Sequence, residues 1–230
     1  MTDLNCICDA HQRKLLSFKQ MKNMFTIVAL LLLCATSCMQ SVADKKIAVQ
    51  TLGVFPQKFK DSIAAAVHRY YGFEVVELPQ IQIPERFFTN VKSPRYRADS
   101  IIALLRTDKP DSVDYVIGLT SADISVSKRD SQGNIRQPQA RYADWGVFGF
   151  GYIGQAGCVV STFRIYHKNL ATVVLRMQKI ALHEIGHNLG LAHCTNNNCF
   201  MRDAAESIKT IDQVEINLCE NCKSKIQLKH

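Results

Sequence analysis

Residues 181–201 read ALHEIGHNLGLAHCTNNNCFM and contain three histidines, a glutamate, two cysteines and a methionine. His183 and His187 are four residues apart, so on a helix both imidazoles lie on one face and can reach a single metal ion. Gly190 can adopt a positive φ angle and end the helix. The chain then turns, and His193 can approach the same ion from another side. The stretch therefore predicts a metal centre with three histidine ligands.

Glu184 follows the first of these histidines directly and is the candidate catalytic residue. Zinc bound by three neutral imidazoles keeps an open fourth position and lowers the pKa of bound water to about 7. A carboxylate beside that water can accept its proton and return it to a leaving amine. The combination is typical of a hydrolase that cleaves peptide bonds.

The spacing continues beyond the histidines. From His183 to Cys222 the chain reads His-Glu-x2-His-x2-Gly-x2-His-Cys-x4-Cys-x-Met-x17-Cys-x2-Cys. Its first eleven residues have the pattern of the metzincin metalloproteases, and the complete motif resembles that of the archaemetzincins. The resemblance implies a catalytic zinc on the three histidines and Met201 in the Met-turn beneath it. It also implies a zinc metallopeptidase, with aminopeptidase-like cleavage of peptides among its expected activities.

The same resemblance implies a second zinc ion on four cysteines, Cys194, Cys199, Cys219 and Cys222. Two cysteines separated by two residues present their thiolates from one tight turn, and a second pair can complete a closed tetrahedron of sulfurs, as in structural zinc sites. Such an ion supplies about 10 kcal/mol or more of folding free energy. Two disulfides are the alternative, favoured if the chain is exported.

Upstream of the motif, apolar segments with strand character alternate with segments of helical spacing. The strand-like segments are residues 46–55, 73–78 and 114–120, and the helix-like segments are residues 56–72 and 94–106. This βαβαβ order predicts an α/β layer with parallel strands. Together with the resemblance, it predicts a metzincin-like α+β fold with a mixed twisted sheet and packed helices.

The segment between this layer and the motif is harder to assign. Residues 121–144 are polar and predict a long loop or a ragged hairpin. Residues 146–153 alternate glycine with aromatic and aliphatic residues, which favours an edge strand that another backbone approaches closely. Residues 158–166 predict a further strand, and Asn169 can cap a helix that carries the motif as far as Gly190.

A signal-like segment occupies residues 22–38, KNMFTIVALLLLCATSC. Its apolar run is about twelve residues, too short to cross a hydrocarbon core of about 30 Å. It predicts a secretory signal, with translation starting at Met21 or Met24. The end of the segment resembles a bacterial lipobox, which implies lipidation of Cys38. Alternatives are an unlipidated cleaved signal and an uncleaved anchor.

We therefore expect a leader (1–37), an N-terminal metzincin-like subdomain that includes the active-site helix (38–190), and a short zinc-held C-terminal subdomain (191–230). The mature protein is expected to be exported and lipid-anchored at a bacterial membrane, on its periplasmic or surface side. If the leader is not a working signal, the protein is cytoplasmic.

The net charge is +8, but the basic residues are scattered along the chain. Residues 195–218, around the cysteines, contain two basic and four acidic residues, which excludes a nucleic-acid-binding finger as the main function. We expect a monomer that acts on peptides or proteins. The alternative is a zinc-holding binding or assembly module with little or no proteolytic activity.

Overall fold

The computed structural model describes residues 45–203 and 207–227 of the chain. The leader, with Cys38 and the domain boundary after residue 37, lies outside the described residues. Within the described part, no helix is both long enough and apolar enough to cross a membrane.

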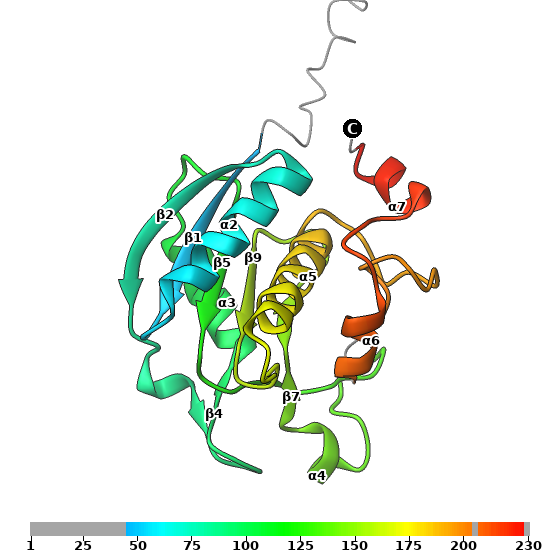
Figure 1. Cartoon of the computed structure of the whole chain (residues 1–230). Coiled ribbons are helices and arrows are strands. Elements are labelled where there is room, and N and C mark those ends of the chain that lie inside the picture. Colours follow the sequence, from blue (N-terminus) through cyan, green and yellow to red (C-terminus); the bar gives the residue numbers. More distant parts are fainter. Residues whose placement is uncertain (1–44, 204–206, 228–230) are drawn as a thin grey trace, which may run out of the picture. The chain divides into compact units, whose positions relative to one another are not determined.

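The main sheet has five strands in the order β2-β1-β5-β9-β8. Neighbouring strands are parallel except at one edge, where β8 runs antiparallel to β9. The strands are β1 (Lys46–Leu52), β2 (Glu74–Ile81), β5 (Tyr115–Thr120), β8 (Gly149–Gly151) and β9 (Gly157–Ser161). The predicted mixed sheet with packed helices is confirmed (Figure 1).

Helices cover both faces of this sheet. Helices α2 (Gln57–Tyr71) and α5 (Leu170–Asn188) contact each other on one face, and α3 (Ala98–Asp108) lies on the other (Figure 1). Side chains alternate between the faces of a strand. Accordingly, Ile47 and Val49 of β1 join the core under α2 and α5, whereas Ala48 joins the core under α3.

A second sheet of four short strands has the order β3-β4-β6-β7. It contains β3 (Phe88–Thr89), β4 (Arg95–Arg97), β6 (Ile124–Val126) and β7 (Trp145–Val147), with the 3-10 helix η2 (Glu85–Phe87) before β3 and α4 (Gln139–Tyr142) before β7. The prediction of a loop or hairpin over residues 121–144 therefore missed β6. The predicted single strand over 146–153 is also divided, since β7 and β8 belong to different sheets.

Local sequence explains the position of α5. The Asn169 side chain accepts a hydrogen bond of 2.9 Å from the backbone N–H of Ala171, as expected of an N-cap. The helix ends at Asn188, and Gly190 has a φ angle of 96°, so the turn after the helix uses the conformation that glycine permits.

The C-terminal segment contains the short helices α6 (Ile208–Gln213) and α7 (Glu220–Lys225). Both lie on the same side of α5 in Figure 1. The segment lacks long apolar runs, but single side chains join the core of α2 and α5, among them Phe200, Met201 and Leu218. The subdomain boundary at residue 190 stays a prediction.

Candidate metal centres and cleft

The structure brings the three histidines of the motif together. His183 and His187 lie one turn apart on α5, and His193 follows the turn at Gly190. Each ring offers one nitrogen within 4.8 Å of a nitrogen of the other two. This spacing lets one ion contact all three side chains.

Two backbone carbonyls orient the first two rings. The Nδ1 atom of His183 lies 2.6 Å from the carbonyl oxygen of Phe200, and Nδ1 of His187 lies 2.7 Å from that of Leu191. A carbonyl oxygen can only accept, so each Nδ1 donates its proton and leaves the Nε2 lone pair for a metal. The third ring has a carboxylate nearby, since Nδ1 of His193 lies 3.6 Å from Oδ2 of Asp203.

Burial keeps the imidazoles of His183 and His187 neutral, which is the form that binds metal. Burial, and then the neighbouring His187, lowers the pKa of His183 to about 3. Burial also lowers the pKa of His187. Three imidazoles within reach of one ion are a donor set that fits zinc with one coordination position left open.

Glu184 lies in the same cleft and is only 7% exposed. Burial raises the pKa of its carboxyl group to about 8, and a hydrogen bond from the backbone of Gly151 opposes this rise. A Cβ atom on Gly149 would lie 2.9 Å from Oε1 of Glu184, and one on Gly151 would lie 2.9 Å from its carbonyl oxygen. The alternating glycines of β8 therefore leave the space that Glu184 occupies.

Met201 is fully buried, and its side chain packs against α5. A Cβ atom on Gly186, in the middle of the histidine motif, would overlap with the Met201 sulfur. The glycine thus allows the methionine to pack directly on α5. No sequence pattern indicated this role of Gly186, because the contact depends on the absence of a side chain and joins two separate segments.

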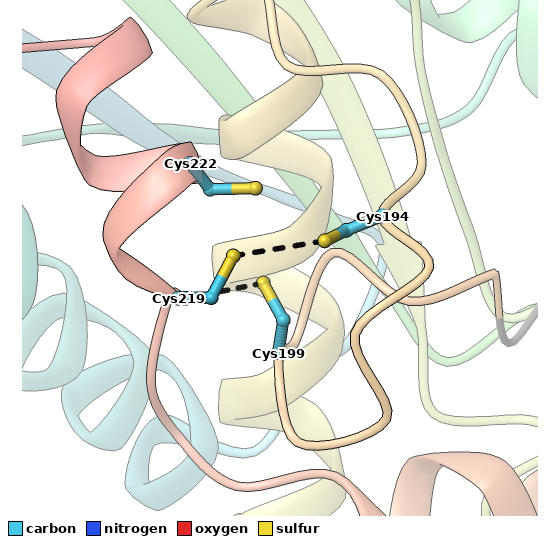
Figure 2. A group of neighbouring side chains, drawn as sticks. All are labelled: Cys194, Cys199, Cys219 and Cys222. Carbon is cyan, nitrogen blue, oxygen red and sulfur yellow. Dashed lines mark hydrogen bonds between the residues drawn. The ribbon is translucent and has the colours of Figure 1, made fainter.

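The four predicted cysteines form a second cluster, which contains none of the three histidines (Figure 2). Their sulfurs all lie within 4.8 Å of one another. The loop after α5 supplies Cys194 and Cys199, whereas Cys219 is the N-cap residue of α7 and Cys222 lies in its first turn. Cys158, by contrast, is buried in β9.

The sulfur geometry fits a metal better than two disulfides. The Sγ atoms of Cys194 and Cys219 are 3.7 Å apart, close to the edge of about 3.8 Å of a tetrahedron with metal–sulfur bonds of about 2.3 Å. A disulfide requires about 2.0 Å, and the described cysteines form none. The backbone N–H of Cys219 also points at Sγ of Cys199, at 3.4 Å (Figure 2).

A cleft of about 600 Å³ contains the histidine centre. One wall is the edge strand β8. Ile211 of α6, Val214, and Lys179 and Ile180 of α5 also line the cleft. The sequence did not single out these lining residues, because they are brought together only by the packing of α6 on α5.

The turn between β8 and β9 is tied to the end of α5. The side-chain amide of Asn188 donates to the carbonyl oxygens of Tyr152 and Gly157, at 3.2 and 3.0 Å. The backbone N–H of Gly154 donates to the carbonyl oxygen of His187 at 2.9 Å. These bonds fix the cleft wall relative to the histidines.

Comparison with known proteins agrees with this geometry. Residues 61–228 match the family described as peptidase family M54. The archaemetzincin of Halobacterium salinarum is 27% identical over 190 residues, which cover 79% of this chain and 99% of the relative. The archaemetzincin of Methanopyrus kandleri is 30% identical over 172 residues, which cover 73% of this chain and 85% of the relative.

Solved structures are similar as well. The crystal structure of the Methanopyrus kandleri archaemetzincin has a TM-score of 0.66 at 26% identity and covers 82% of this chain and 97% of that one. That of the Archaeoglobus fulgidus archaemetzincin, complexed with malonate, has a TM-score of 0.62 at 27% identity and covers 78% and 99%. The chain therefore belongs to peptidase family M54 and is a zinc metallopeptidase of the archaemetzincin type.

Proposed function

We propose that His183, His187 and His193 hold a catalytic zinc ion and that Glu184 is the general base in peptide-bond hydrolysis. When bound, zinc polarises the peptide carbonyl group and lowers the pKa of water. The observation that carries the proposal is the buried Glu184 carboxyl group in the same cleft as three imidazoles, two of which have Nδ1 bonded to a backbone carbonyl group.

Within this proposal, Glu184 accepts a proton from the attacking water and returns it to the leaving amine. A carboxyl group with a pKa raised to about 8 by burial is matched to proton transfer near neutral pH. The carbonyl groups of Phe200 and Leu191 hold the two helical imidazoles in the orientation that ligation requires. The glycines of β8 allow the carboxyl group to remain beside them.

The substrate is an extended peptide that adds to the edge of the main sheet. Strand β8 pairs with β9 on one side and is the last strand of that sheet, and it lines the cleft along Gly149, Phe150 and Gly151. An edge strand offers unpaired N–H and C=O groups to an incoming chain. Bound in this way, the peptide runs past Glu184.

We propose that the four cysteines hold a second, structural zinc ion. The closed set of sulfurs supports this assignment, because no position is left open for a substrate. Protein purified under mild conditions without chelator should contain two zinc ions per chain. One zinc ion per chain, with no free thiol group on any of these four cysteines, would show that they form two disulfides instead of a second zinc site.

The test of the catalytic assignment is the Glu184→Gln variant. It should retain zinc and lose peptide hydrolysis, whereas Glu85→Gln, on the exposed helix η2, should behave as the wild type. Undiminished hydrolysis by Glu184→Gln would remove Glu184 from this role. Zinc-loaded wild-type protein that cleaves no peptide of a broad panel would favour the binding or assembly module.

Aminopeptidase-like cleavage stays a prediction. It requires recognition of a free α-amino group, which matched peptides with free and acetylated N-termini test directly. Export and lipid anchoring at Cys38 are likewise proposals based on the leader. Incorporation of a labelled fatty acid by the wild type, and its loss in Cys38→Ala, would support them, and an unlabelled wild type would overturn the anchor.

A further inference from the structure

Lys179 is a buried cation on the wall of the cleft. It lies on α5 one turn before His183, lines the cleft and is only 6% exposed. Lysine is rarely buried unless its ammonium group is paired. The partners of Lys179 therefore decide what this charge can do.

Two backbone carbonyl groups hold the ammonium group in place. Lys179 Nζ donates to the carbonyl oxygen of Ile211 at 2.9 Å and to that of Asp212 at 3.3 Å. These carbonyls are near the C-terminal end of α6, so Lys179 also caps that helix. An ammonium group has three N–H donors, and the two carbonyl groups accept from two of them, which leaves one donor for a ligand.

The carboxylate that acts on the charge of Lys179, that of Asp212, is itself paired with another side chain. The Arg176 guanidinium group pairs with both oxygens of Asp212, at 2.7 and 2.6 Å. Among the residues that the structure describes, no carboxylate oxygen lies within ion-pair distance of Lys179 Nζ. The positive charge of Lys179 is therefore available to a ligand in the cleft.

The remaining lining gives the cleft a positive bias. Lys128 and Arg129 also line it, whereas its acidic lining residues in the described chain are Asp99 and Glu184. Asp99 is paired with Arg97 at 3.0 Å. Near Lys179 the walls are apolar, formed by Ile180, Phe200, Ile211 and Val214. An ammonium group in apolar surroundings attracts an anion more strongly than one in water does.

We infer that Lys179 makes the cleft selective for peptides with a carboxylate next to the scissile bond. This inference rests on the proposed peptidase function and names its substrate class. The carboxylate comes either from an aspartate or glutamate side chain or from the C-terminus of a short peptide. The carboxylate accepts the third N–H of Lys179 in a charge-assisted hydrogen bond, while the aliphatic part of the substrate contacts the apolar walls.

The test uses fluorogenic peptides that differ only beside the cleaved bond. One set compares glutamate with glutamine on each side of the bond, and a second compares a free C-terminal carboxylate with its amide. For the zinc-loaded wild type, kcat/KM for the carboxylate peptide should exceed that for its neutral partner by about tenfold or more. The set that shows the ratio identifies the source of the carboxylate.

Two variants test whether Lys179 causes this ratio of kcat/KM values. In Lys179→Met the ratio should fall to about one. In Lys179→Glu the ratio should fall below one, and a peptide with lysine at the same position should be preferred. Lys58→Met removes an exposed lysine at the start of α2, far in sequence from the cleft residues, and should keep the wild-type ratio. Zinc content and melting temperature are measured for every variant, because Lys179 also caps α6.

Each outcome separates this inference from the proposed function. Equal hydrolysis of carboxylate and neutral peptides by the wild type overturns the inference and leaves the peptidase assignment intact. A Lys179→Met variant that melts earlier but keeps the preference also overturns it, because the lysine is then only a cap. Peptide binding to zinc-loaded Glu184→Gln is measured in parallel. If the wild type cleaves no peptide but the Glu184→Gln variant still binds carboxylate peptides in preference to their neutral partners, only the proposed hydrolysis is overturned.

Discussion

His193 and Cys194 are neighbours in the chain, yet their side chains belong to different ligand clusters. His193 joins His183 and His187, whereas the Cys194 sulfur lies 3.7 Å from that of Cys219. The backbone N–H of Cys194 also donates to the carbonyl oxygen of Met201 at 2.8 Å. We therefore expect a change in the cysteine cluster to reach His193, a proposed ligand of the other centre, over one peptide bond.

We accordingly expect Cys222→Ser to weaken catalysis without altering a histidine ligand. Loss of one thiolate should release the second zinc ion, loosen the loop that carries His193 and lower kcat/KM by about tenfold or more, as loss of supporting interactions around metal ligands does. Zinc analysis and peptide assays measure the two effects. Cys158→Ala, in β9, should keep two zinc ions. Unchanged activity in Cys222→Ser would contradict the coupling.

The contact between Gly186 and Met201 leads to a second prediction. In Gly186→Ala, the added methyl group overlaps with the Met201 sulfur, and overpacking of this kind costs about 1–3 kcal/mol of unfolding free energy. Thermal or urea unfolding of the zinc-loaded protein measures the loss.

A compensating change provides the control for Gly186. Met201→Ala removes the overlapping group and leaves a cavity of its own, so the double variant should be less destabilised than the sum of the two single variants. Additive losses would show that the two residues do not compete for the same space.

The glycines of β8 lead to a third prediction. A methyl group at Gly151 meets the carbonyl oxygen of Glu184 at 2.9 Å and its Oε2 atom at 3.3 Å. Gly151→Ala should therefore displace Glu184, the proposed general base, and lower kcat by about 100-fold while zinc content is preserved. Peptide assays and zinc analysis on the same samples measure both.

Gly133→Ala is the matched control. Gly133 has open space around its Cα atom but a φ angle of 84°. The substitution should cost about 1 kcal/mol of stability through backbone strain and leave kcat unchanged. If Gly151→Ala has the kcat of Gly133→Ala, Glu184 does not depend on the space that β8 provides.

The sequence predicted those parts of the site that follow from local spacing. The positions of His183, His187 and Gly190 determine the helical pair of rings and the turn after it, since both depend on residues a few positions apart. The alternation of strands and helices before residue 120 predicted the parallel layer for the same reason. The four cysteines were grouped by their spacing and by the family resemblance.

Other parts had no local signal. The groups that orient His183 and His187 are carbonyls of Phe200 and Leu191, and any residue type supplies a carbonyl. The division of residues 146–153 between two sheets depends on which strand each half pairs with. The periodicity of the sequence does not indicate that pairing. Lys179 is unremarkable in the sequence, and its burial follows from the packing of α6 on α5.

The ion pair between Arg176 and Asp212 fixes α6 beside the cleft and leads to a prediction about pH. The Arg176 hydrogen bond is the main cause of the lowered pKa of Asp212. A carboxyl group with a lowered pKa stabilises the fold above its ordinary pKa of about 3.9, and this contribution is lost as the pH falls through the folded-state value.

Asp212→Asn should therefore lower the unfolding free energy at pH 7. The effect should be smaller near pH 3, because the wild-type carboxyl group is then protonated in the unfolded state and, as the pH falls further, in the folded state as well. The Asp212 side chain is 41% exposed, so the expected loss at pH 7 is only about 1 kcal/mol. Urea unfolding of both proteins at each pH measures it. Asp111→Asn, at an exposed position without an ion pair among the described residues, is the matched control. A difference between wild type and Asp212→Asn that is equal at both pH values would show that Arg176 gains nothing from the charge of Asp212.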